Sequence, residues 1–430
     1  MLHKSKLAFW QAQMAGTFPG SSLAYDFTNS LSPLIGSPIP MTRSTTATYY
    51  NSSGLRVTAA VNEPRLDYNP NTLAPEGYLM EQQKTNLFLQ SNNFNDAIWS
   101  KPDTTITTAA GIGASGLQDM DLIQIGNLGT AFVQQDVTIG AGAILTISAD
   151  VKKSTTGSWL RIQVSSISGA DGFRGWFNLD TGAWGTTSVM GAGTLIASSV
   201  VYCSATGIYR ISITGILNGS DTTARSYIIS SNADNSTLRL SNANWYMGNT
   251  QLEVGTCPTS VIVTGASQVI RAADIALSSS ISSWYNQSEG TILIEGKTFD
   301  PCVTQSPHVA LIGFDDNTAS NRHVMRLLNL GTGQTLTATA TAAATVAAIT
   351  ATPVNTLTTY KVGYVYGLNN FAGSRNGSTP VVDSNGTPPN VARVTLGFDI
   401  SGGANANIWI RKFAYWPYQR SNSELMSITS

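Results

Sequence analysis

Short segments in which apolar and polar residues alternate recur along most of the chain. Trp159–Val164 and Tyr209–Ile213 alternate in the first half, and the apolar segments Gly290–Glu295 and Thr359–Tyr366 are predicted strands in the second. A period of two places the apolar side chains on one face, which is typical of a half-buried β-strand. Because stretches with helical periodicity are nearly absent, the pattern predicts an all-β chain.

Turn signals separate these segments and divide them between two domains. Asp180–Gly182 and Asn218-Gly219 lie between predicted strands of the first domain, and Asn376-Gly377, the strongest short hairpin signal, lies in the second. Many short strands at this spacing are typical of sandwiches and jelly rolls. We therefore predict two antiparallel β-sandwich (jelly-roll) domains, at residues 81–264 and 265–430.

Two segments of the second domain carry more specific local signals. Residues 335–352 are rich in alanine and threonine, and we expect one strand with small side chains there. Ser421–Glu424 fits a capping box, in which the serine and glutamate side chains bond each other's backbone N–H groups. A short helix is therefore expected to end the chain.

Residues 1–80 differ from the rest because they hold seven of the sixteen prolines and few alternating segments. Proline favours extended and turn conformations, so the segment reads as an extended N-terminal arm. Such an arm cannot bury a core of its own. We expect it to be held by a neighbouring subunit or a larger assembly; a tail folded back on its own domains is the alternative.

Charge is sparse and balanced in this chain. Charged residues make up 11%, less than half the usual share of about 25%, and 24 Lys and Arg face 25 Asp and Glu. No basic field exists to attract nucleic acid. Apolar runs do not reach membrane-spanning length. Near the N-terminus the apolar run is only Leu7–Trp10, which is too short for a signal-peptide core. We therefore expect no nucleic-acid partner, no membrane insertion and no secretion by the Sec route.

Motifs for chemistry are absent from the sequence. The three cysteines, Cys203, Cys257 and Cys302, form no pair with metal-ligand spacing, and we expect isolated buried thiols. The three histidines lie far from one another, and no nucleophile elbow or phosphate-binding loop is present. We predict no catalytic residues. Close acid pairs, Asp119 with Asp121 and Asp315 with Asp316, leave glycan hydrolysis as a minor alternative.

Aromatic residues offer a binding chemistry instead. Exposed rings stack on sugars while amides and hydroxyls fix the sugar hydroxyls, and this chain is rich in all of these groups. Trp184 follows a turn, and Trp284 and Tyr285 lie between the domains, so these three are the candidate carbohydrate-binding residues. Five further tryptophans sit within strand alternation and are expected in the cores: Trp99, Trp159, Trp176, Trp245 and Trp409.

One cluster of oxygen side chains could bind a cation. Asp315, Asp316 and Asn317 directly follow a predicted strand, and Ca²⁺ takes six to eight oxygen ligands. The alternative is an ordinary turn stabilised by its own carboxylates, which we favour. We expect no cofactor, with Ca²⁺ at these three residues as the alternative.

Several strings resemble a class of bacteriophage virion proteins. They occur in the same order as in that class and span most of residues 40–426, although each string alone is only moderately specific. These strings are Thr42–Tyr49, Ala60–Asp67, Gly77–Leu87, Ser91–Trp99, Gly248–Gly255, Arg271–Asp274, Ser283–Thr291 and Ile410–Pro417.

This resemblance implies a phage structural protein, such as a head spike, head fibre or tail fibre. It implies a carbohydrate-binding-module-like jelly roll at 81–264, a concanavalin- or laminin-G-like sandwich at 265–430, and a homotrimer. It further implies synthesis in the host cytoplasm, attachment to other virion proteins through residues 1–80, and display on the virion surface. The expected partner is a host cell-surface polysaccharide.

Two other functions stay open at this point. A decoration or connector protein would use the same folds only to pack on neighbours, because a fold does not decide a function. A glycan-cleaving depolymerase would need two carboxylates that face each other across a cleft. Adhesion without chemistry is the function we expect.

Overall fold

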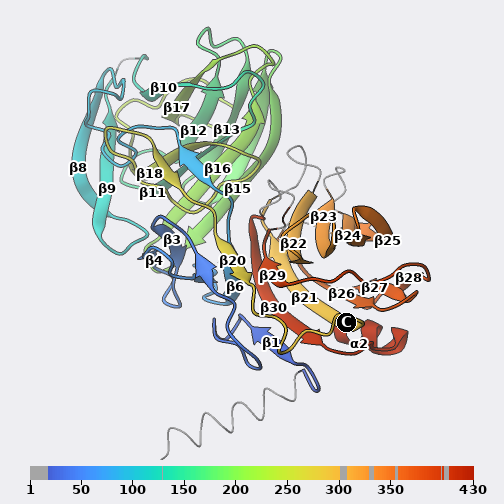
Figure 1. The fold of residues 1–430 in the computed structure, drawn as a ribbon. Coiled ribbons are helices and arrows are strands. Elements are labelled where there is room, and N and C mark those ends of the chain that lie inside the picture. Colours follow the sequence, from blue (N-terminus) through green and yellow to red (C-terminus); the bar gives the residue numbers. More distant parts are fainter. Residues whose placement is uncertain are drawn as a thin grey trace, which may run out of the picture.

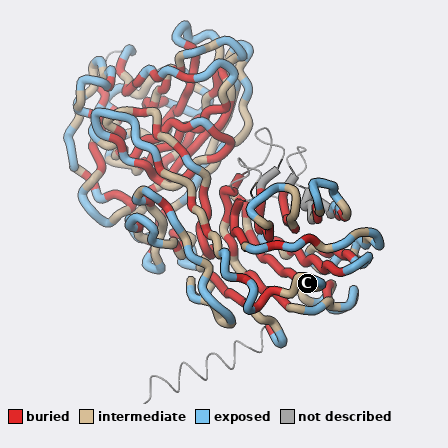
Figure 2. The backbone as a smooth tube through the Cα atoms, viewed as in Figure 1, coloured by how far each residue is buried: buried red, intermediate tan, exposed pale blue. Residues whose placement is uncertain are grey.

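The computed structural model describes residues 18–127, 129–300, 308–328, 334–353, 357–398, 400 and 406–430. It consists of two β-sandwiches side by side, with one short helix near the C-terminus (Figure 1). The burial pattern in Figure 2 shows a separate buried interior in each sandwich. The predicted all-β class with two antiparallel sandwiches is confirmed.

The first sandwich, here called the jelly roll, pairs a five-stranded sheet with a six-stranded sheet. Their facing sides meet in one core that includes Ile147, Ile162, Phe173 and Trp245. The five-stranded sheet runs in the order β10 (Val133–Thr138), β17 (Thr223–Ser231), β12 (Trp159–Ser165), β13 (Gly172–Asn178) and β14 (Ala183–Met190). The six-stranded sheet runs in the order β15 (Thr194–Cys203), β16 (Ile208–Ile216), β11 (Leu145–Lys153), β18 (Asn244–Val254), β9 (Gln118–Ile125) and β8 (Thr104–Ile112).

The C-terminal sandwich pairs a seven-stranded sheet with an eight-stranded one around a core rich in tyrosine and phenylalanine. The seven-stranded sheet is β2 (Met41–Thr42), β20 (Ile275–Ser278), β29 (Arg393–Leu396), β22 (His308–Asp315), β23 (Arg322–Leu328), β24 (Gln334–Thr341) and β25 (Ala344–Pro353). The eight-stranded sheet is β28 (Val381–Asp383), β27 (Phe371–Arg375), β26 (Thr359–Tyr366), β21 (Gly290–Thr298), β30 (Ile408–Trp416), β6 (Pro75–Met80) and β5 (Leu66–Tyr68), with β1 (Leu23–Asp26) also on β30.

The described part of residues 1–80 is not a free arm. Strand β1 pairs with one half of β30, Leu23 opposite Tyr415, and β6 pairs with the other half, Met80 opposite Ile408. Leu23, together with the rings at 25 and 27, is almost fully buried in the C-terminal core. The prolines had suggested an unpaired chain, but they fall between these short strands and at the start of β6. Residues 18–80 therefore fold back on their own chain, which was the weaker expectation.

This pairing makes the C-terminal sandwich discontinuous in sequence. The chain starts in it, leaves for the jelly roll and returns. Strands β7 (Lys84–Asn86) and β19 (Val269–Arg271) pair with each other where the chain leaves and re-enters. The jelly roll is thus an insertion, and the predicted C-terminal domain at 265–430 lacks the strands that residues 18–80 supply.

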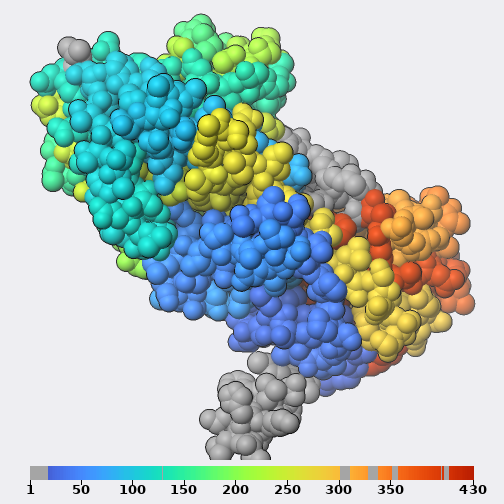
Figure 3. Space-filling model, turned by 60° about the vertical axis from the view of Figure 1, so that its left-hand side comes forward, coloured from blue at the N-terminus to red at the C-terminus, as the bar shows by residue number. Residues whose placement is uncertain are grey.

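A hairpin from the N-terminal segment docks on the jelly roll. It consists of β3 (Ala47–Tyr50) and β4 (Arg56–Ala59). The buried guanidinium of Arg56 lies 2.6 Å from an Asp150 carboxylate oxygen, and the Cys203 thiol donates to the Gly54 carbonyl at 3.1 Å. The N-terminal segment therefore contacts both sandwiches, and Figure 3 shows it spread across the surface between them in blue.

Five buried charges join the segments at the domain junction. Asp274 accepts from Arg43 at 2.8 Å and from Arg65 at 2.5 Å, and Glu81 accepts from Arg65 at 2.7 Å and from Arg271. All five residues are at most 2% exposed. We call this set the junction network. Because it draws on residues 43, 65, 81, 271 and 274, it fixes the N-terminal segment, the exit to the jelly roll and the return from it at one point.

Other local expectations have mixed outcomes. Helix α2 (Asn422–Thr429) begins with the predicted capping box, and Asn376 and Gly377 both have positive φ at the turn after β27. Residues 335–352 form two strands instead of one, because Ala342 and Ala343 adopt positive φ at a turn with no glycine to signal it.

The predicted buried thiols are partly tested. Cys203 and Cys257 are buried and free, and Cys302 lies outside the described residues. Across the described ranges, no helix has the length and hydropathy needed to cross a bilayer.

Removing residues 1–80 is expected to unfold the C-terminal sandwich, since three strands of its eight-stranded sheet are lost. Burial of each large apolar side chain contributes about 1.5–3 kcal/mol, and Leu23, Tyr25, Phe27, Tyr78 and Met80 would all be missing. Differential scanning calorimetry should show only the jelly-roll transition. A comparator that starts at residue 18 keeps every described strand and should show both transitions. Two unchanged transitions after removal of 1–80 would contradict the discontinuous domain.

Replacing Glu81 by Gln should destabilise the protein by about 3–5 kcal/mol, because the guanidinium groups of Arg65 and Arg271 would stay buried without that charge. Burial alone raises the pKa of Glu81, but Arg271 and Arg65 outweigh it and hold this pKa at about 2. The stabilisation is therefore full above the unfolded pKa of about 4.3 and is lost as pH falls toward 2. Urea unfolding at pH 7 and pH 3 measures both effects, with Glu289→Gln as the control outside the network.

Candidate functional site

A cleft of about 530 Å³ lies where the two sandwiches and the N-terminal segment meet. We call it the interdomain cleft. Its volume falls within the range of about 300–1,000 Å³ that small-molecule sites occupy, and junctions between domains are a preferred place for such sites. Its walls come from the hairpin β3–β4 and strand β5, from residues 199–202 of the jelly roll, from residues 258–261, and from β21 and β30.

Aromatic rings from all three parts of the molecule line the cleft. Trp409 projects from β30 on the same side as Lys297 on β21, because the two residues are directly opposite in the sheet. Its half-buried ring packs on Phe299, with ring centroids 4.6 Å apart, and the Lys297 ammonium lies 5.4 Å from its centre. Tyr202 on β15 packs against Tyr209, with ring centroids 4.8 Å apart and the two rings tilted by 32°. Tyr49, Tyr50 and Tyr68 line the N-terminal side.

Asp67 fixes the tryptophan of this wall. One carboxylate oxygen accepts from the Trp409 indole N–H at 2.8 Å, and the other accepts from the Tyr50 backbone N–H at 2.7 Å. Asp67 is 6% exposed. Burial raises the pKa of its carboxyl to about 6, although the hydrogen bonds from Tyr50 and Trp409 lower it. A carboxylate from β5 therefore orients a ring from β30.

The other carboxylates of the cleft are also engaged. Glu76 accepts from Lys297 at 2.7 Å and from the Asn69 amide at 3.2 Å. Glu81 belongs to the junction network and additionally accepts from the Ser260 hydroxyl at 2.7 Å. These bonds hold the carboxylates in structural roles, so the acidic groups shape the cleft and leave the rings and neutral groups to meet a ligand.

Neutral polar groups complete the lining. They come from the loop between β5 and β6 and from the facing walls: Thr48, Asn69, Asn71, Thr72, Ser199 and Ser260. Rings give apolar faces, and amides and hydroxyls exchange hydrogen bonds with hydroxyl groups. The arrangement suits an uncharged ligand with both apolar faces and many hydroxyls.

Two of the predicted sugar-stacking residues are buried in the C-terminal core. Trp284 is 8% exposed and Tyr285 is 7% exposed. The Tyr285 ring stacks on Phe314 at 5.2 Å and on Tyr415 at 5.1 Å. A ring that stacks on a sugar must reach solvent, so this placement corrects the expectation that both rings serve a binding surface. They occupy the core because rings from both sheets, Phe314 on β22 and Tyr415 on β30, pack on them.

Trp184 is half-buried at the edge of the jelly-roll core. Its ring packs edge-on against Phe177, with centroids 5.4 Å apart, and its indole N–H donates to the Ser199 carbonyl at 3.0 Å. Ser199 lines the interdomain cleft, whereas Trp184 does not. Trp184 thus contributes to the cleft only indirectly, by its hydrogen bond to the cleft residue Ser199.

Asp315, Asp316 and Asn317 form the turn that we favoured over a cation site. Asp315 is buried in an ion pair with Arg393 and accepts from the Asn317 N–H at 2.8 Å. Asp316 accepts from the Thr318 N–H at 2.9 Å. The described residues contain no group of three or more His, Cys, Asp or Glu placed to hold a metal ion. The Arg393 guanidinium donates to side-chain oxygens of Asp315 and Asn317, whereas Asp316 accepts from Thr318 and Asn321.

The cleft residues were missed because their neighbourhood depends on distant pairing. Asp67 and Trp409 are 342 positions apart. Trp409 was expected in the core and is half-buried in the cleft, and Trp159 is half-buried too, whereas Trp99, Trp176 and Trp245 are buried as predicted. The sequence feature that points to the cleft is the adjacent pair Tyr49 and Tyr50, two rings in a short β-like segment outside either predicted core.

Comparison with known proteins gives weak matches. No family model and no curated protein matches the chain. The CBM40 module of Ruminococcus gnavus IT-sialidase, solved with α2,3-sialyllactose, aligns with 34% of this chain and 84% of its own length at 15% identity and a TM-score of 0.29. Domains LG4–5 of the mouse laminin α1 chain align with 74% of this chain and 89% of their own length at 9% identity and a TM-score of 0.23. These scores carry no argument about function.

The indole N–H signal of Trp409 should titrate with a midpoint near pH 6, because its acceptor is the Asp67 carboxylate with a pKa of about 6. Protonation weakens the bond and should move the signal. Proton–nitrogen NMR spectra between pH 4.5 and 7.5 measure this shift. The titration should vanish in Asp67→Asn, and its persistence there would show that another group is responsible. Since the folded pKa of Asp67 exceeds the unfolded value, this carboxyl should favour folding more at pH 5 than at pH 7.

Proposed function

We propose that this protein binds glycans and that the glycan lies in the interdomain cleft. The single observation that carries this proposal is the set of half-buried rings that three separate parts of the chain bring to one cleft, led by Trp409 and Tyr202. Neutral amides and hydroxyls surround these rings. A flat apolar face with polar groups beside it is what a pyranose ring requires.

Binding is favoured over hydrolysis by the state of the cleft carboxylates. A glycosidase uses one carboxyl as acid and a second as base or nucleophile. In this cleft Asp67 is held by Trp409 and Tyr50, Glu76 by Lys297 and Asn69, and Glu81 by arginines. These partners assign the three groups to positioning, and the proposal therefore contains no chemical step.

The setting we propose is the surface of a bacteriophage particle, as a spike or fibre that contacts host polysaccharide. Support comes from the ordered strings that resemble phage virion proteins. On such a particle, weak sites in many copies, as in a homotrimer, would raise avidity by about 10²–10⁴. Attachment through residues 1–80 and synthesis in the host cytoplasm remain predictions.

Glycan binding should depend on the rings of the cleft. A glycan array with the purified full chain identifies a ligand. Tyr202→Ala and Trp409→Phe should each weaken binding of that ligand at least fivefold in calorimetric titration, because stacking area or ring orientation is lost. Tyr418→Ala removes a solvent-exposed ring that does not line the cleft and should change binding less than twofold.

Absence of binding across host polysaccharides would favour the alternative, a decoration or connector protein without a ligand. Release of reducing ends from such polysaccharides would instead show the depolymerase.

A further inference from the structure

The jelly roll carries three arginines on the outer face of its five-stranded sheet. Leu160, Ile162 and Val164 of β12 point into the core, so Arg161 points outward. Arg174 on β13 lies opposite Gln163, which follows Arg161 on the same face. Arg239 comes from the segment after β17, and all three lie close enough for their charges to interact. We call them the arginine cluster.

These charges lack the partners that buried arginines usually have. Arg161 is 8% exposed, yet neither its guanidinium nor that of Arg239 forms an ion pair with a residue that the structure describes, and the buried Nε of each has no hydrogen-bond partner there. Arg174 has no carboxylate partner among the described residues: its Nε donates to the Ser188 hydroxyl at 3.0 Å, and its guanidinium lies 5.1 Å from the centre of the Trp176 ring. Burial, Arg174 and Arg239 together lower the pKa of Arg161 to about 10. An unpaired charge with so little solvent is costly unless an anion joins it.

The carboxylates on this face are already used. Asp136 is held by Arg225 at 2.8 Å, and Asp234 accepts from the Thr186 N–H at 2.8 Å. Neither relieves the cluster. By contrast, every other arginine discussed above, in the junction network and in the interdomain cleft, has a carboxylate partner.

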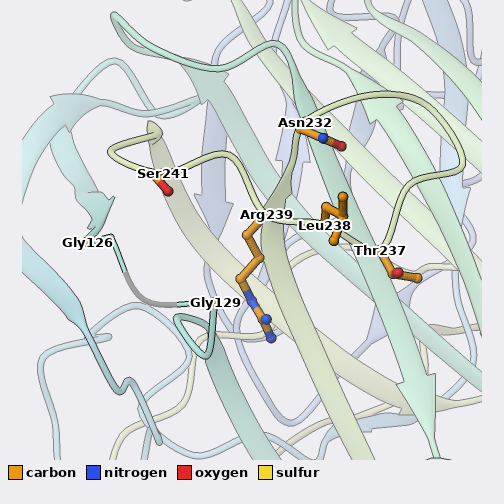
Figure 4. Close-up of a pocket in the computed structure, with 7 residues that line it drawn as sticks. All are labelled: Gly126, Gly129, Asn232, Thr237, Leu238, Arg239 and Ser241. Atoms are coloured by element: carbon orange, nitrogen blue, oxygen red, sulfur yellow. The ribbon is translucent and has the colours of Figure 1, made fainter.

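A hollow opens beside Arg239, the member of the cluster that lines it; Arg161 and Arg174 do not line it. It measures about 290 Å³ and is lined by Arg239 with Asn232, Thr237 and Ser241, which are neutral and exposed (Figure 4). In Figure 4 the Arg239 side chain extends toward the side where Gly129 lies, away from Asn232 and Ser241. The volume suits a ligand of about one sugar unit, near the lower limit for small-molecule sites. Guanidinium groups match a carboxylate through paired N–H donors, and the amide and hydroxyls can meet sugar hydroxyls.

We propose that the arginine cluster and this hollow form a second site, which binds the carboxylate of an acidic sugar. The ligand class rests on the proposed glycan-binding function, but the site is separate from the interdomain cleft. The two sites would let one chain contact a neutral and an acidic unit of a polysaccharide.

Trigalacturonate and its neutral methyl ester are the probes, because they share the sugar chain and differ at the carboxyl groups, which are charged in the first and carry uncharged methyl esters in the second. The full chain should bind trigalacturonate at least tenfold more tightly than the ester, and this binding should weaken with added salt. Arg239→Gln should weaken it at least tenfold. Arg225→Gln removes a charge of the same face that already has a carboxylate partner, and should change it less than twofold.

Arg161→Gln separates a binding role from a structural one. Removal of a buried unpaired charge should raise the melting temperature of the free protein while it abolishes the extra stabilisation by trigalacturonate. If Arg161 instead stabilises the fold, Arg161→Gln should lower the melting temperature of the free protein. That result would overturn the proposal.

Further outcomes discriminate between the sites. Three results would overturn the second site. They are equal binding of trigalacturonate and its methyl ester, no binding of either, and an unchanged affinity for trigalacturonate in Arg239→Gln. Stabilisation by inorganic phosphate without binding of trigalacturonate would overturn the carboxylate assignment. Tyr202→Ala should leave trigalacturonate binding intact, so failure in the cleft and failure at the arginine cluster are told apart.

Discussion

The junction network is the interaction on which the rest of the structure depends. Buried ion pairs give little net stability over apolar groups, but they tolerate few alternative arrangements because any unpaired charge is costly. Here Arg43, Arg65 and Arg271 meet Glu81 and Asp274. The carboxylate of Glu81 also accepts from Ser260 at the end of the jelly roll. The network thus specifies one relative position for the N-terminal segment and both sandwiches.

That position creates the interdomain cleft. Its walls lie on segments that contact one another only because the network and the hairpin β3–β4 hold them, and Glu81 belongs both to the network and to the lining. A site assembled in this way is formed before the ligand arrives, which reduces the ordering that binding must impose. The same rigidity explains how a single carboxylate, Asp67, can hold Trp409 by one hydrogen bond.

Local features were predictable from sequence and long-range ones were not. The strand predicted at Trp159–Val164 and the capping box at Ser421 are set by neighbours in sequence, and both are present in the structure. The pairing of β1 with β30 leaves no such trace, because a short edge strand among prolines looks like an unpaired segment. Trp284 and Tyr285 share their core with Leu23, and Trp409 donates to Asp67, so the exposure of all three rings depends on partners from the N-terminal segment.

The central claim is that residues 18–80 belong to the folded body and hold the two sandwiches in place. Amide hydrogen exchange of the full chain tests it most directly. The amides of β1 and β6 that bond to β30 should exchange as slowly as those of β21, the other neighbour of β30, since all of them would open only with the whole sandwich. Exchange in β1 and β6 that is faster by several orders of magnitude, while β21 stays protected, would contradict it.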